Sequence, residues 1–265
     1  MDALPDVVIG VLGLLEHPDT EPPELEKHLA QDPILVGKLL SLVNTPFHGA
    51  NREINTIPDA IMMVGFSGLR SLLLASSLAP HIGTDVGGYG HVKKGIWLHS
   101  VAVAAAARAL ARLARRSPRE REELFVMGLL HDVGKMVTGE FMADVDIPLE
   151  YRDDVTPLER ERLGIDHAEV GARIAEQWQL GPALVTHLRQ HHHPEDQEHS
   201  LSILRLADAI AHEVGVGWEI GKAPHAVFPA ADLALLRLED GWEDTRCEVA
   251  ETIVVAVESM QGVFG

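Results

Sequence analysis

The apolar residues of this chain recur at helical spacing, and no segment of useful length shows the apolar–polar alternation of a strand. Leu35, Leu39 and Leu42, for example, fall on one face of a helix. Ala, Leu and Val dominate the apolar residues, and aromatic residues make up only 5% of the chain. Since Ala and Leu lose little conformational freedom in a helix, this pattern predicts an all-α fold.

Proline, glycine and capping residues mark where the predicted helices begin and end. Up to residue 80, helices are predicted over residues 5–16, 22–30, 33–43 and 57–64, and then, after an interruption at Gly65, over 69–78. Beyond residue 95, the predicted helices cover residues 96–116, 118–130, 164–178, 184–192, 200–214 and 248–260. Residues 215–229 are predicted to form a loop.

A glycine-rich stretch at residues 81–95 predicts a linker between two helical subdomains. Residues 1–80 contain no Cys/His cluster, no glycine-rich phosphate loop and no nucleophile–base pair. We therefore expect that subdomain to be an interaction module. Residues 96–265 contain the candidate ligands described below and are predicted to form a metal-binding helical subdomain.

The net charge, the cysteine count and the absence of long apolar runs predict which partners and which compartment this chain has. The net charge is −18, whereas nucleic-acid binding normally requires a positive surface, so direct nucleic-acid binding is not expected. The single cysteine, Cys247, excludes a disulfide framework within the chain and fits a reducing compartment. No positively charged leader and no run of ~20 uncharged apolar residues is evident, so we expect a cytoplasmic location and no membrane association.

The segment His131-Asp132-Val133-Gly134-Lys135 places two kinds of metal ligand side by side. An imidazole and a carboxylate together suit a divalent ion such as Fe, Mn or Zn. Adjacent ligands can address neighbouring positions around one ion, and a carboxylate such as that of Asp132 can also bridge two ions. Gly134 permits close approach of another backbone or a ligand, and Lys135 offers a point charge for a phosphate group.

Five further residues extend this pattern into a candidate metal-ligand set: His99, His167, His191, His192 and Asp208. Asp208 lies on an otherwise apolar helix face, where a carboxylate is costly to bury unless it is paired or binds a metal. Each residue also has a simpler interpretation. His99 could be a hydrogen-bonded core histidine, the histidines before Pro194 could lie at a solvated helix end, and Asp208 could be a cap or a surface residue.

The order of these residues resembles that of the HD superfamily, and nearly the whole chain resembles the HDOD domain family. The resemblance covers about residues 4–215. In the first half it rests on the segments 4–5, 32–35, 38–40, 44–47, 60–61 and 64–65. In the second half it rests on Trp97, 128–135, Glu159, 166–171, Trp178, 191–192 and Pro194.

The resemblance implies a two-lobed, all-α bacterial signalling protein with a C-terminal HD-type helical subdomain. Such proteins act mainly as regulatory or scaffold modules, so one or more signalling proteins are the expected partners. Many members of the family lack the metal ligands, whereas this chain has a full set. That set resembles the HD-GYP phosphodiesterases, which use two or three metals to hydrolyse cyclic di-GMP. Here, however, no Gly-Tyr-Pro motif follows His191-His192.

Three interpretations follow from these residues. In the first, the ligand set holds two divalent ions, Asp132 bridges them, and Asp132 and Lys135 take part in hydrolysis of a phosphorylated small molecule or nucleotide. His99 is then either a ligand or a group that orients one. In the second, the metals only cross-link helices, and metal binding stabilises the fold. In the third, the chain is a helical adaptor with an empty site.

Overall fold

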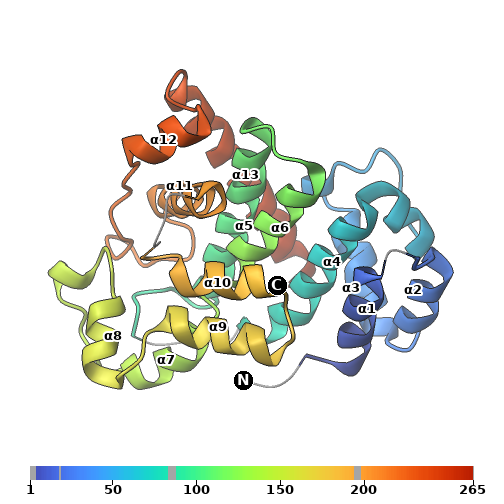
Figure 1. Cartoon of the computed structure of the whole chain (residues 1–265), viewed down its shortest axis with the longest axis horizontal. Coiled ribbons are helices and arrows are strands. Elements are labelled where there is room, and N and C mark those ends of the chain that lie inside the picture. Colours follow the sequence, from blue (N-terminus) through green and yellow to red (C-terminus); the bar gives the residue numbers. More distant parts are fainter. Residues whose placement is uncertain (1–3, 18, 83–87, 194–197, 265) are drawn as a thin grey trace. The chain divides into compact units, whose positions relative to one another are not determined.

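The computed structural model describes residues 4–17, 19–82, 88–193 and 198–264. Within these ranges the regular structure is helical and no strand occurs, apart from an isolated bridge between His91 and Trp218 (Figure 1). The predicted all-α fold is therefore confirmed.

The chain divides into two compact units. The larger comprises Ile82–Val254, and the smaller comprises Asp2–His81 together with Val255–Gly265. The predicted linker, residues 81–95, spans the start of the larger unit, and its residues 83–87 lie outside the described residues.

The smaller unit is built from α1 (Asp6–Glu16), α2 (Pro22–Leu29), α3 (Pro33–Val43), the 3₁₀ turn η1 (Pro46–His48) and most of α4 (Ile57–Ile82). Asp32 begins α3 as predicted, because its Oδ1 accepts the backbone N–H of Leu35 at 3.0 Å. Gly65 interrupts α4 with a φ of 71°, which a glycine adopts without a Cβ clash. The interruption expected at this glycine is therefore present.

The larger unit holds the remaining helices in chain order. They are α5 (Gly95–Leu113), α6 (Pro118–Leu130), α7 (Lys135–Met142), η2 (Leu149–Tyr151), α8 (Thr156–Leu163), α9 (His167–Gln177), α10 (Pro182–Gln190), α11 (His199–Val214), α12 (Ala230–Leu236) and the first part of α13 (Trp242–Phe264).

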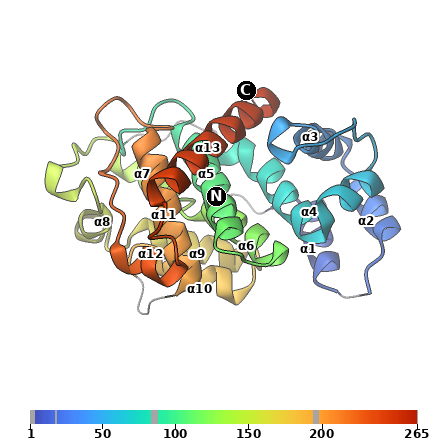
Figure 2. The same ribbon diagram turned by 90° about the horizontal axis from the view of Figure 1, so that it is seen from above.

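Helix α5 is the core of the larger unit and lies beside α6 and α11 (Figure 1, Figure 2). Its alanines from 104 to 107 are fully buried, and their small side chains let the neighbouring helices approach closely. A capping box formed by Ser117 and Glu120 begins α6. This packing fixes the C-terminal end of α6, where His131 and Asp132 follow.

Several predicted boundaries differ from the structure. The predicted helix 164–178 begins only at His167, because Gly164 adopts φ 73° to end α8 and Asp166 caps α9. The predicted helix 96–116 ends at Leu113, and Arg115 adopts a left-handed φ of 57°. Helices α7, α8 and α12 were not predicted, and α13 is longer than predicted at both ends. Residues 215–229 contain no helix, as expected.

Two stretches, Ile57–Ala79 and Gly95–Leu113, are long and apolar enough to cross a membrane by length and composition alone. The sequence predicts no membrane span, because Arg108 interrupts the apolar run at residues 101–107. Buried residues make up 61% and 78% of their apolar windows. Core helices of soluble proteins pass the same test, so this is weak evidence for a membrane span.

The contact between α5 and α6 gives a prediction for Gly128. A Cβ at this position would lie 2.7 Å from Ala104 Cα, which is backbone and cannot rotate away. We expect Gly128→Ala to lower the free energy of unfolding by about 1–3 kcal/mol. Urea titration measures this, with Gly262→Ala as the control, because Gly262 is also helical but has open space around it. Equal effects of the two substitutions would contradict this account of the packing.

Candidate metal centre

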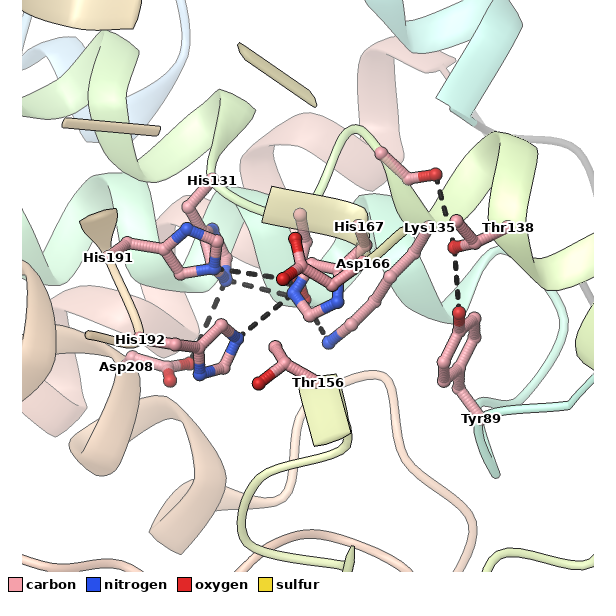
Figure 3. Close-up of polar contacts among 12 residues, drawn as sticks. Tyr89, His131, Lys135, Thr138, Thr156, Asp166, His167, His191, His192 and Asp208 are labelled. Carbon is pink, nitrogen blue, oxygen red and sulfur yellow. Dashed lines mark hydrogen bonds and ion pairs between the residues drawn. The ribbon is translucent and has the colours of Figure 1, made fainter. Parts of the chain in front are cut away.

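Five segments of the larger unit bring the predicted ligands together. His99 lies on α5, His131 and Asp132 follow α6, His167 is the first residue of α9, His191 and His192 follow α10, and Asp208 lies on α11. Figure 3 shows the imidazoles of His131, His167, His191 and His192 gathered around one point. All seven residues therefore lie in one cluster, although they span more than a hundred positions of the sequence.

The first group of donors consists of Asp132, His167, His191 and His192, whose ligand atoms all lie within 4.8 Å of one another. His167 Nε2 is 2.9 Å from His192 Nε2 and 3.3 Å from Asp132 Oδ1. His191 Nε2 is 4.0 Å from the same carboxylate oxygen. Three imidazoles thus converge on one face of the Asp132 carboxylate.

The second group consists of His99, His131 and Asp208, with the same close spacing. Asp208 Oδ1 is 3.0 Å from His99 Nε2 and 3.9 Å from His131 Nε2. Asp132 also faces this group, because its Oδ2 lies 3.4 Å from His131 Nε2 and 3.9 Å from His99 Nε2. Asp132 therefore directs one oxygen to each group, which is the geometry expected of a bridging carboxylate.

Buried polar atoms in this cluster lack hydrogen-bond partners. They are both ring nitrogens of His99, His191 Nε2, Asp132 Oδ1 and Asp208 Oδ1. Leaving such atoms unsatisfied costs free energy, and native proteins rarely do so. Ring nitrogens and carboxylate oxygens that face one another are the donors that divalent Fe, Mn or Zn ions take, so the residues present fit metal ions.

Hydrogen bonds on the far side of three rings fix which nitrogen faces the cluster. His131 Nδ1 donates to Gly128 O at 2.8 Å, and His191 Nδ1 donates to Leu188 O at 2.7 Å. His167 Nδ1 donates to Glu159 Oε2 at 2.7 Å. In each ring Nε2 is left directed at the other donors, as metal-binding histidines require.

Glu159 is fully buried and is central to this arrangement, although it carries no ligand atom of either group. Its Oε2 accepts both the ring N–H and the backbone N–H of His167, the latter at 2.9 Å. Its Oε1 accepts the Tyr89 hydroxyl. That hydroxyl also lies 2.7 Å from Thr138 Oγ1, as Figure 3 shows. Sequence reasoning noted Glu159 only as part of the resemblance, because nothing local indicates its role.

Burial and neighbouring charges set the protonation of the cluster. Burial, reinforced by His167 and His131, lowers the pKa of His191 to about 3, and burial holds the pKa of His192 well below its usual value. The pKa of Asp132 lies well below its usual range despite its burial, because of His131 and Lys135. Near neutral pH the cluster therefore presents an ionised carboxylate to uncharged His191 and His192, which can bind a metal without losing a proton.

Lys135 lines a pocket beside the cluster and also pairs with Asp132. Its ammonium group lies 2.7 Å from Asp132 Oδ2, and the residue is only 7% exposed. The phosphate contact expected of Lys135 from the sequence stays a prediction. Gly134 beside it allows the close backbone approach that was expected, since a Cβ there would lie 1.9 Å from His167 O.

A pocket of about 700 Å³ opens onto the cluster within the larger unit. His131, Asp132, His191, His192 and Asp208 line it. Its side chains are nearly balanced in charge: Lys135, Arg152, Arg205 and Lys222 face the acidic residues Asp132, Asp146, Asp153, Asp208 and Glu219. Both groups of donors can therefore be reached by a small molecule.

Comparison with known proteins supports the family resemblance. The HDOD domain profile matches residues 1–194. An uncharacterised protein of Treponema pallidum (strain Nichols) is 25% identical over 267 residues, covering 97% of this chain and 50% of that protein. The chain thus spans about half the length of the curated relative that it matches.

Two solved structures show the same fold. An HDOD domain protein of unknown function from Geobacter sulfurreducens superposes with a TM-score of 0.73 at 24% identity, covering 99% of this chain and 92% of that one. A protein from Shewanella amazonensis SB2B, described as a candidate phosphohydrolase, gives 0.72 at 23% identity, covering 99% and 95%. At these identities the likeness extends to the fold alone.

The contact between Glu159 and His167 predicts that Glu159→Gln weakens metal binding without removing a ligand. An amide accepts the ring proton less strongly, so Nε2 becomes a poorer donor. We expect a 10–100-fold loss of affinity, roughly that of other residues which orient metal ligands. Competition with a chelator measures it, and Glu161→Gln on the exposed side of α8 is the control. Unchanged affinity in Glu159→Gln would refute the assigned role.

The depressed pKa of His191 predicts a pH dependence of stability in chelator-treated protein. The unfolded chain protonates this imidazole near pH 6.5, whereas the folded chain does so only near pH 3. The contribution of uncharged His191 to the free energy of unfolding is therefore complete above about pH 6.5 and is lost as the pH falls. We expect His191→Gln to reduce the slope of unfolding free energy between pH 6 and pH 4 by up to about 1.4 kcal/mol per pH unit. An unchanged slope from urea titrations would contradict this.

Proposed function

This chain belongs to the HDOD domain family, and we propose that it holds a two-metal centre that binds and hydrolyses phosphate esters. The observation that carries the proposal is the pocket whose floor exposes both groups of metal donors. A purely structural metal site is normally closed by protein ligands, whereas a catalytic one keeps a position open to small molecules. The side chains of His192 and Asp208 remain 21% and 26% exposed at this floor.

The charge that two metal ions would give the pocket supports an anionic substrate. With its nearly balanced side chains, the metal-free pocket offers little attraction for an anion. Two divalent ions add four positive charges at the floor and make the pocket strongly cationic. Phosphate binding is therefore expected to depend on metal loading.

Asp132, the other metal donors and Lys135 have different proposed roles. Asp132 would hold both ions, one through each oxygen, and the remaining donors would hold one ion or the other. When bound, such ions would supply Lewis acidity toward a phosphoryl oxygen and lower the pKa of water. Lys135 pairs with Asp132 Oδ2, and its ammonium group would become available to the phosphate if an ion took this oxygen. The name of the Shewanella protein is consistent with this chemistry.

A second function, regulation through a protein partner, is favoured by the smaller unit. Ile34 and Met62 there are each 74% exposed. Methionine is enriched at protein interfaces, whose centres are more apolar than the rest of the surface. We propose that this unit contacts a signalling protein. The test compares partner binding by the parent chain with that by the double variant Ile34→Ser, Met62→Ser. Unaltered binding by the variant would exclude these two residues from the partner-binding surface.

The test of the main proposal combines metal analysis with an assay. The chain is purified without chelator, its bound Fe, Mn and Zn are counted, and hydrolysis of bis-p-nitrophenyl phosphate is followed with each ion supplied. Two ions per chain with metal-dependent turnover support the proposal. Two ions without turnover of this ester or of cyclic dinucleotides favour the purely structural interpretation, and no bound metal removes both.

The bridging position of Asp132 predicts the effect of Asp132→Asn. An amide cannot supply two anionic oxygens, so both ions lose a ligand and their mutual repulsion is less compensated. We expect metal affinity and hydrolysis to fall by more than about 100-fold, beyond the loss of a residue that only orients a ligand. Asp144→Asn, at an exposed position, is the control. Retention of both ions by Asp132→Asn would contradict the bridge.

A further inference from the structure

His212 lies one helical turn beyond Asp208 on α11, so the two side chains share a face. Its Nε2 is 3.4 Å from Asp208 Oδ1, the same oxygen that faces His99 and His131. The His212 ring is nearly parallel to that of His99, with an interplanar angle of 7° and ring centres 4.9 Å apart. Its side chain is 11% exposed and lines the pocket.

Asp208 Oδ1 is surrounded by imidazole nitrogens. Three imidazole Nε2 atoms, from His99, His212 and His131, lie within 4 Å of it, at 3.0, 3.4 and 3.9 Å. None of them makes a hydrogen bond with it, and the oxygen is buried without a partner. An arrangement in which lone-pair atoms crowd together without hydrogen bonds is stabilised by a cation placed between them.

We propose that His212 is a fifth protein ligand of the ion held by His99, His131, Asp208 and the bridging Asp132. This rests on the proposed two-metal centre and adds to it a ligand that lies beyond the seven recognised from the sequence. Ligand atoms about 2.1 Å from one ion and about 90–120° apart lie roughly 3.0–3.6 Å from one another. The three nitrogen–oxygen distances around Asp208, 3.0, 3.4 and 3.9 Å, lie in or close to that range.

The proposed role of His212 gives the two ions different numbers of protein ligands and therefore different affinities. With His212, the second ion has three imidazoles and the carboxylates of Asp208 and Asp132, whereas the first has three imidazoles and Asp132 alone. More ligands mean tighter binding, so the ion beside His212 is held more firmly. The ion beside His191 and His192 then keeps more positions for a phosphate group or water.

The first experiment compares metal retention in the full chain. The wild type and His212→Ala are loaded with Zn²⁺ and titrated with a chelator. We expect the tighter ion of the wild type to weaken by more than about 100-fold in His212→Ala, with the weaker ion little changed. His187→Ala is the matched control, since His187 is a helical, largely buried histidine that pairs with Glu198 instead. Unchanged retention of both ions in His212→Ala would overturn the proposal.

The second experiment places a reporter at the same position. Cobalt(II) bound by a thiolate absorbs in the near ultraviolet by charge transfer, whereas imidazole and carboxylate ligands give no such band. We expect cobalt-loaded His212→Cys to show this band and His187→Cys to show only the background of the exposed Cys247. A band that appears in His212→Cys and not in His187→Cys supports the ligand position. Because a thiolate reaches less far than an imidazole, absence of the band overturns the proposal when His212→Ala also retains both ions like the wild type.

The experiments distinguish failure of the proposed two-metal centre from failure of the role of His212. If the wild type binds no metal, the two-metal centre itself is refuted. If it binds two ions and both His212 variants behave like their controls, only the role of His212 is refuted. Thermal unfolding of the metal-free proteins is recorded alongside, and equal midpoints in wild type and His212→Ala show that weaker retention reflects a lost ligand.

Discussion

The carboxylate of Asp132 is the group on which the arrangement of the larger unit depends. It is 1% exposed, and an unpaired charge at such a depth would be very costly. Lys135 neutralises one oxygen, and imidazoles from α5, α9 and the ends of α6 and α10 surround the carboxylate. The helices must therefore meet at this point, and the close packing of α5 with α6 through Gly128 makes that possible.

A second layer of contacts keeps the imidazoles in place. Glu159 holds both the backbone and the ring of His167, and Tyr89 and Thr138 hold Glu159. Gly134 lets the backbone before α7 touch His167 O, so the segment carrying Asp132 and the start of α9 are in direct contact. The donors are thus positioned by hydrogen bonds and backbone packing without an ion, which lowers the free-energy cost of binding one.

The sequence predicted the fold class and the cluster of seven residues because each has a local signature. Helical spacing marks α3 and α5, and an acidic residue such as Asp208 on an apolar face signals a special role. The contacts of Glu159 could not be predicted, since Tyr89 lies 70 positions away from it. Helix α8 was missed because charged residues dominate it and leave little apolar periodicity. The pairing of Lys135 with Asp132, and the approach of His212 to Asp208, depend on distances that no motif encodes.

The pairing of Lys135 with Asp132 has a consequence for how the protein responds to its surroundings. Because an ammonium group from the chain itself already balances the buried carboxylate, the larger unit can retain its fold when no ion is bound. If the proposed ions bind, gain or loss of metal would change the charge of the pocket without unfolding the chain. The fraction of metal-loaded chains would then follow the free concentration of the ion, so the occupancy of the centre would report metal supply.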